Sequence, residues 1–158
     1  MGLAALAATS TDAMVRRLGF RRWQLLHRIV YVIAALAVVH FCMQSKLDLW
    51  EPTIMAGIYA WLMGYRALMP LVAARQRLPL AWLTLLGLAV TGLTAFGEAL
   101  YFHLAYGVDL MRVIDADFSL ATGIRPAAIV FGLTFALTLI AALRTWMQPA
   151  AKERPRFA

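Results

Sequence analysis

Long runs of apolar residues, with polar residues confined to the ends of each run, dominate this chain. Four runs reach the length that a membrane-spanning helix needs, which is about 20 mainly apolar residues. We expect spans over 29–44 (extended backwards to Trp23), 53–74, 80–106 and 126–147. The last contains AAIVFGLTFALTLIAAL, which carries no charge. The pattern therefore predicts an all-α polytopic membrane bundle with four transmembrane helices.

Prolines support these boundaries. Pro52 and Pro126 fall at the starts of the second and fourth spans, where the missing amide donor costs nothing. Pro70 lies inside the second span and predicts a kink near the end of that helix.

The first residues, MGLAALAATST, are apolar but too short to span a membrane, and they lack the basic flank of a signal peptide. We expect them to be a short remnant, the last turns of a helix whose beginning is missing from an N-terminally truncated chain.

Composition supports the membrane class. Of the 158 residues, 63% are hydrophobic and 15% are charged, and the mean hydropathy is +0.73. A soluble domain would be about a quarter charged and less than half apolar. The single cysteine, Cys42, excludes an internal disulfide and a cysteine-cluster metal site. Cys42 could form a site for a soft metal ion with its neighbours His40 and Met43. The alternative is that Cys42 only packs, as small buried thiols commonly do.

The net charge of +7 could indicate nucleic acid, but the distribution of the charge excludes that class. Basic residues gather at one set of segment ends, whereas the loops 45–52 and 107–125 are mostly acidic. By the positive-inside rule the basic ends and the C-terminus are cytoplasmic and the two loops face outward. The basic ends carry Arg16, Arg17, Arg21, Arg22, Arg28, Arg66, Arg75, Arg77, Arg144, Lys152, Arg154 and Arg156, and the opposite side carries Lys46, Arg112 and Arg125.

Two histidines, His27 and His40, lie in the first apolar stretch. Thirteen residues of helix separate them by about 20 Å along the axis, within a hydrocarbon core of about 30 Å. One metal ion cannot reach both, but two haems, one in each leaflet, could take one imidazole each. The two side chains would point about 140° apart on an ideal helix. Hydrogen-bonded packing imidazoles are the alternative.

Three arginines surround His27, at positions 21, 22 and 28. Arg21, Arg22 and Arg28 could pair with haem propionates at the membrane boundary. They could equally fix the cytoplasmic end of the span.

The stretch STDAMVRRLGFRRWQLLHRIVYVIAALAVVHFCMQSK resembles the MsrQ family (also called YedZ) of the ferric-reductase-like transmembrane superfamily. The resemblance continues less specifically to about Arg75. It predicts a partial haem-binding core at 1–75 and a two-helix extension with a cytoplasmic tail at 76–158. The matching positions are Ser10, Thr11, Ala13, Met14, Leu18, Gly19, Arg22, Trp23, Gln24, Leu26, His27, Val30, Tyr31 and His40.

The resemblance implies a multi-pass subunit of the bacterial inner membrane that binds haem b. Such a subunit passes electrons to a periplasmic molybdopterin-containing methionine sulfoxide reductase, MsrP. The electrons come from a cytoplasmic flavin reductase or from quinone, and the resemblance leaves a bound FMN open. Carried over by motif, His27 and His40 are the family's metal-ligand positions on this helix. The chain would then be an electron-transfer subunit with no catalytic residues of its own.

One departure from the family matters. Members have further helices upstream, one with another histidine ligand, and haem held by two imidazoles needs histidines from two helices. A truncated, non-functional remnant is therefore an alternative. A transporter or channel fragment is a weaker one, because the predicted midplane residues are mostly apolar.

Two further residues stay open. His103 could pair with His40 on one iron, or be an interfacial residue among Tyr101, Phe102 and Tyr106. Glu98, the acid that lies well inside a predicted span, could relay protons or could be a neutral carboxyl bonded to a neighbouring helix.

Overall fold

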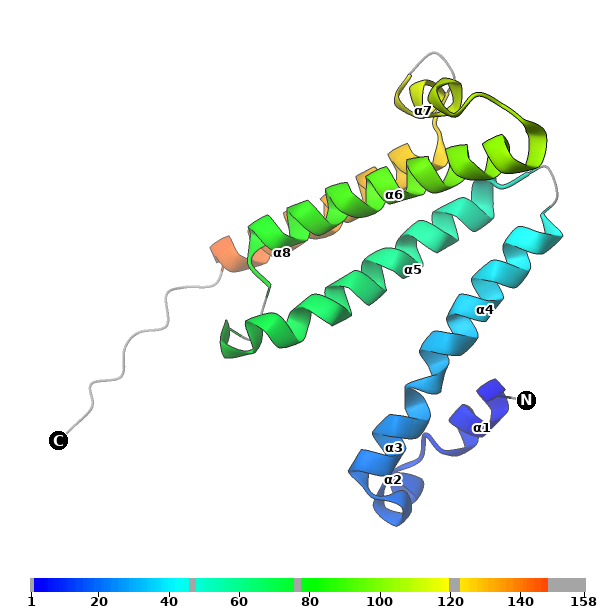
Figure 1. The fold of residues 1–158 in the computed structure, drawn as a ribbon. Helices are drawn as coiled ribbons and strands as arrows, with labels where there is room; N and C mark the ends of the chain where they lie inside the picture. The colour runs from blue at the N-terminus through cyan, green and yellow to red at the C-terminus, as the bar shows by residue number, and fades with distance from the viewer. Residues whose placement is uncertain (1, 46–47, 76–77, 120–122, 148–158) are drawn as a thin grey trace. The chain divides into compact units, whose positions relative to one another are not determined.

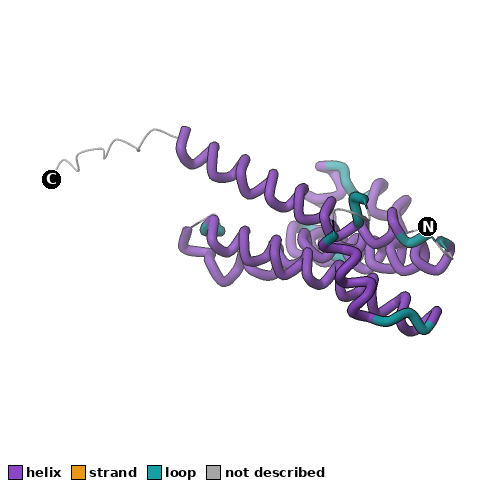
Figure 2. The backbone as a smooth tube through the Cα atoms, turned by 90° about the horizontal axis from the view of Figure 1, so that it is seen from above, coloured by secondary structure: helices purple, strands orange, loops and turns teal. Residues whose placement is uncertain are grey.

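The computed structural model describes residues 2–45, 48–75, 78–119 and 123–147. Every regular element in this part of the chain is a helix, and it contains no strand, which confirms the all-α prediction (Figure 2). The predicted cytoplasmic tail at 148–158 lies outside the described residues. The elements are α1 (Gly2–Ala8), α2 (Asp12–Leu18), α3 (Phe20–His27), α4 (Ile29–Gln44), α5 (Trp50–Leu68), the 3₁₀ helix η1 (Met69–Arg75), α6 (Leu80–Tyr106), α7 (Leu110–Phe118) and α8 (Pro126–Met147).

Three helices of the described chain are long and apolar enough to cross a membrane. They are Phe20–Gln44, which joins α3 to α4, together with α6 and α8. Their lengths of 25, 27 and 22 residues exceed the roughly 20 residues that a bilayer requires. The chain is therefore a multi-pass membrane protein built as a helical bundle.

The second predicted span forms a helix, but a shorter one than expected. Helix α5 ends at Leu68 after 19 residues, and the chain continues as 3₁₀ helix through Pro70. Proline has no amide hydrogen, and its ring clashes with the preceding turn, so an α-helix cannot pass through it undisturbed. Helix α5, which carries Glu51 and Arg66, is not among the three apolar helices. That α5 is a fourth span stays a prediction.

The contacts divide the chain into two compact units, Met1–Pro52 and Thr53–Ala158. The domain boundary at 75/76 rests on the extent of the family resemblance and stays a prediction. The first unit contains α1 to α4, where α1 packs against α4 and α2 against α3. Thr11 caps α2 by accepting a hydrogen bond from the amide of Met14, and Gly19, at φ 78°, turns the chain into α3.

In the second unit α6 and α8 lie side by side, and α7 packs at one end of them (Figure 1). The seam between α6 and α8 uses small residues, which let two backbones approach closely in lipid. A Cβ added at Gly87 would lie 3.0 Å from Thr134 Oγ1. Helix α5 meets the pair through Gly57, where a Cβ would lie 2.7 Å from both Thr94 Oγ1 and Val130 Cγ2.

Candidate functional site

His27 is the last residue of α3, and its ring is held by the backbone one turn earlier. Its Nδ1 lies 3.1 Å from the carbonyl oxygen of Trp23. A carbonyl oxygen only accepts, so Nδ1 carries the hydrogen and donates it. The neutral ring then has its lone pair on Nε2, which is the arrangement typical of a histidine that binds a metal.

The side chain of Trp23 fixes the orientation of the same ring. The indole and imidazole stack with their centroids 4.2 Å apart and their planes 29° apart. The indole Nε1 donates to the carbonyl oxygen of Thr9, 3.0 Å away. Trp23 therefore holds His27 on one side and the end of α1 on the other.

Ser10 stands against the second nitrogen of His27. Its Oγ lies 3.2 Å from His27 Nε2 and 2.6 Å from the carbonyl oxygen of Leu6. A serine hydroxyl has one hydrogen, and the shorter contact is to a group that can only accept. The hydroxyl therefore donates to Leu6, and no hydrogen remains to bridge its oxygen and the lone pair of His27 Nε2. His27 Nε2 is the nitrogen at which another ligand could bind.

The residues of this network are those that carry the family resemblance. Ser10 contacts His27, Thr11 caps α2, Gly19 makes the turn and Trp23 holds the imidazole ring. Sequence reasoning identified these residues as a motif and missed their roles, because contacts between the segment after α1 and helix α3 have no signature in residue spacing.

His40 lies on α4 and is exposed. Its Nε2 is 3.5 Å from the side-chain nitrogen of Gln44, a contact at the outer limit for a hydrogen bond. His40 is therefore much less firmly oriented than His27. The helix between them is also interrupted, because Tyr31 N bonds to Arg28 O in an i to i+3 pattern, so the ideal angle of about 140° does not strictly apply.

The described residues bring together no group of three or more histidine, cysteine, aspartate or glutamate side chains that could hold a metal ion. A single haem-ligating imidazole does not require such a group. His27 fits that role, since its ring is fixed and its Nε2 carries the lone pair. His27 ends α3 and His40 lies near the far end of α4, so the structure keeps the two histidines apart.

The three arginines predicted beside His27 are all exposed. Arg21 and Arg28 are seven residues apart and so share one helix face, apart from the interruption at Arg28. The ion pairs found in the described chain lie in the other unit and involve none of the three. Arg21, Arg22 and Arg28 thus present accessible cations close to His27 in the sequence, as either predicted role requires.

His103 and Glu98 have different surroundings from each other. His103 Nδ1 lies 2.9 Å from the carbonyl oxygen of Val108, and Tyr101, Phe102 and Tyr106 pack against one another nearby in sequence. His103 belongs to the second compact unit and His40 to the first, so their pairing on one iron stays a prediction.

Glu98 forms an ion pair that the sequence did not indicate. Arg125 Nη2 lies 2.6 Å from Glu98 Oε1, and Arg125 Nε lies 3.0 Å from Asp117 Oδ1. Asp117 and Arg125 fall in the predicted outward loop, where solvated charges are expected. One feature of the sequence could have indicated this ion pair. Arg125 directly precedes Pro126, which begins the fourth predicted span, so Arg125 falls at the same end of the predicted bundle as Glu98.

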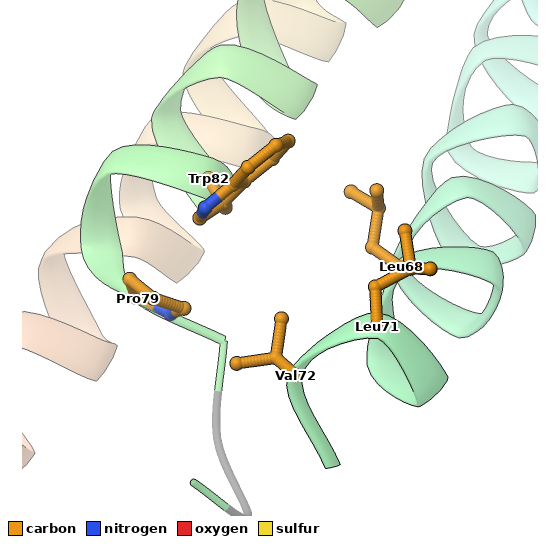
Figure 3. Close-up of a pocket in the computed structure, with 5 residues that line it drawn as sticks. All are labelled: Leu68, Leu71, Val72, Pro79 and Trp82. Atoms are coloured by element: carbon orange, nitrogen blue, oxygen red, sulfur yellow. The ribbon is translucent and has the colours of Figure 1, made fainter. Parts of the chain in front are cut away.

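The cavities in the described part of the second unit include two that involve aromatic side chains. One, of about 270 Å³, lies where η1 meets the start of α6 and is lined by apolar side chains and Trp82 (Figure 3). The other, of about 610 Å³, is lined by α5, α6 and α8, with Trp61, Tyr65 and Arg144 among its residues. No predicted site residue lines either cavity.

No family model matches the chain, and no solved structure matches it. Curated relatives do. A protein of Rhodospirillum rubrum is 51% identical over 74 residues, which are 47% of this chain and 35% of that protein. Proteins of Ralstonia nicotianae (51% over 73 residues, 45% and 34%) and Klebsiella pneumoniae (48% over 64 residues, 40% and 31%) are similar too. Each is named as the heme-binding subunit MsrQ of protein-methionine-sulfoxide reductase. Over these 64 to 74 residues the chain is similar to proteins of the MsrQ family.

The chain spans about a third of the length of the MsrQ proteins that it matches. Their name mentions haem and not flavin, so FMN stays a prediction. The ligand positions His27 and His40 and the arginines at 21, 22 and 28 likewise stay predictions.

Proposed function

We propose that this chain is a haem-binding membrane subunit that passes electrons to a methionine sulfoxide reductase. The observation that carries the proposal is the hydrogen bond from His27 Nδ1 to the carbonyl of Trp23, since it leaves Nε2 as the ligating nitrogen. The names of the MsrQ relatives support the same group.

Each residue of the first unit would have a distinct task. His27 would hold the iron through Nε2, and the stacked Trp23 would keep the imidazole ring from rotating. His40 would hold a second haem nearer the other side of the membrane. Arg21, Arg22 and Arg28 would neutralise propionates at the boundary. Haem, when bound, supplies a centre that accepts and releases one electron.

The finer parts of the proposal concern partners and place. We place the chain in the bacterial inner membrane with a cytoplasmic C-terminus, because the basic residues gather at one set of segment ends. The recipient would be a periplasmic molybdopterin-containing reductase, and the electrons would come from a cytoplasmic flavin reductase or from quinone. Chemistry on methionine sulfoxide would then belong to the recipient, so this chain would not be the catalytic subunit.

A difference spectrum tests the proposal. The chain is purified in detergent, supplied with haem, and measured as dithionite-reduced minus oxidised. Bands of a b-type cytochrome are expected, and His27→Ala should remove most of them because the ligating nitrogen is gone. His103→Ala is the matched control, since that ring already bonds to Val108 and should leave the bands unchanged.

Two other results have a clear meaning. Absence of haem bands in the unaltered, helical chain would favour the non-functional remnant. Equal bands in the unaltered chain and in the variant with alanine at both 27 and 40 would refute the two histidines as ligands.

A further inference from the structure

Three segments of the second unit meet at one buried ionic cluster. Glu98 comes from α6, Asp117 from α7, and Arg125 from the residue before α8. Arg125 Nη2 lies 2.6 Å from Glu98 Oε1, and Arg125 Nε lies 3.0 Å from Asp117 Oδ1. The side chains of Glu98 and Asp117 are 5% and 0% exposed, and that of Arg125 is 27% exposed. We call these three residues the acid pair cluster.

The acid pair cluster has one cation for two acids. Each ion pair uses one oxygen of its carboxyl group, and the other two oxygens, Glu98 Oε2 and Asp117 Oδ2, are buried without a hydrogen-bond partner. With both acids ionised, the cluster would carry a net negative charge out of water. An uncompensated charge in such a place is strongly unfavourable, and the usual response is that the group becomes neutral.

No second cation compensates this charge among the described residues. On α7, Asp109, Arg112 and Asp115 are exposed, and Asp109 caps the helix by accepting from the amide of Arg112. On α6, the exposed His103 has its Nδ1 against the carbonyl oxygen of Val108, and in the first turn of α5 Glu51 is exposed. Arg125 is the cation that pairs with both buried acids.

We propose that the acid pair cluster is a proton-binding site, in which Glu98 and Asp117 share one proton and Arg125 balances the remaining negative charge. The proton comes from the aqueous phase and is released back to it, with no change of oxidation state. Arg125 is partly exposed, so the cluster has an edge at which this exchange can occur.

Burial of Asp117 raises the pKa of its carboxyl group above the ordinary value, and the hydrogen bond and charge of Arg125 oppose that rise. This direction agrees with the geometry. A carboxyl group whose pKa is higher in the folded chain stabilises the fold below its ordinary pKa, and the contribution is lost as the pH rises through the raised value.

The proton also has a structural consequence. Asp117 and Val113 are the buried residues of α7, so the cluster is one of the contacts that hold α7 to the two long helices. Loss of the shared proton leaves a buried negative charge and weakens that attachment. Helix α7 is thus held more firmly while the shared proton is bound, and less firmly once a rising pH removes that proton.

Infrared spectroscopy of the full chain in lipid nanodiscs tests the site directly. At pH 6 the unaltered chain should show the carbonyl band of one protonated carboxyl group, shifted in deuterated water. Glu98→Gln and Asp117→Asn should each abolish it, because the single acid left in either variant forms a neutral pair with Arg125. Persistence of the band in a variant that keeps one of the two acids would mean that this acid holds the proton by itself, and it would overturn the shared site. Asp115→Asn, an exposed position on α7, is the control and should keep the band.

Thermal unfolding of the same samples gives a second measurement. The melting temperature of the unaltered chain should fall as the pH is raised from 6 to 9, whereas in Glu98→Gln and Asp117→Asn the fall should be at least halved. Absence of the band in the unaltered chain, or its persistence in either variant, would overturn the proposal. Neither measurement depends on haem, so this proposal and the proposed function succeed or fail separately.

Discussion

At the scale of single residues, the side chain of Trp23 decides how His27 is presented. Its indole both stacks on the imidazole and bonds to the carbonyl of Thr9, so it combines packing with a specific hydrogen bond. Residues that orient a metal ligand in this way commonly affect metal affinity by about 10- to 100-fold.

Replacement of Trp23 by Phe separates these two contributions. The variant keeps an aromatic ring to stack on His27 but loses the donor to Thr9. We expect haem affinity to fall by about tenfold, the lower end of that range, as measured by titrating haem into the purified chain. Trp146→Phe is the control, since Trp146 is 85% exposed. Equal affinities in the two variants would remove Trp23 from the site.

How far the sequence predicts the site can be seen by comparing His27 with Glu98. His27 was identified because an imidazole in an apolar run needs a partner, and its neighbours match a family motif. The pairing of Glu98 with Arg125 was missed, because it joins residues 27 positions apart across a turn and a short helix. Such a contact depends on how α6, α7 and α8 pack, and no periodicity along the chain encodes it.

At the scale of elements, helix positions followed from apolar runs, while their ends depended on local chemistry. Helices α6 and α8 occupy the predicted 80–106 and 126–147. Helix α5 stops at Leu68 and not at 74, because Pro70 breaks the hydrogen-bond ladder earlier than the apolar run suggests. Apolar character alone does not say where a ladder of backbone hydrogen bonds is interrupted.

The close approach of α5 to its neighbours gives a prediction at this scale. Gly57→Ala places a methyl group 2.7 Å from atoms of Thr94 and Val130, so the helices must move apart. Overfilled packing typically costs about 1–3 kcal/mol, measured here as the free energy of unfolding in detergent. Gly97→Ala, on α6, meets nothing within 4 Å and should change it far less. A stable Gly57→Ala variant would contradict this packing.

At the scale of the whole molecule, the number of membrane crossings depends on α5. Four crossings place the two ends of α5 on opposite sides of the membrane, whereas three leave both ends on one side. The basic character of the chain after α5 and the acidic character before it favour opposite sides.

Cysteine labelling distinguishes the two topologies. In a Cys42→Ser background, Asp48→Cys and Leu71→Cys place single thiols at exposed positions near either end of α5. An impermeant maleimide added to intact cells should label position 48 and reach position 71 only after permeabilisation. Asp115→Cys serves as the outward reference. Labelling of both α5 positions under the same condition would mean that α5 does not cross.

The short contact between Ser10 and His27 has one more consequence. The serine oxygen occupies the place at which any ligand of that imidazole nitrogen must arrive, and it is tethered through Leu6 to the chain's first helical turns. A ligand that binds His27 Nε2 would therefore displace the oxygen of Ser10 and move the segment that carries Ser10. The position of the amino-terminal turns would then depend on whether a ligand is bound to this nitrogen. The fluorescence of Trp23, whose indole bonds to Thr9, would change with that position.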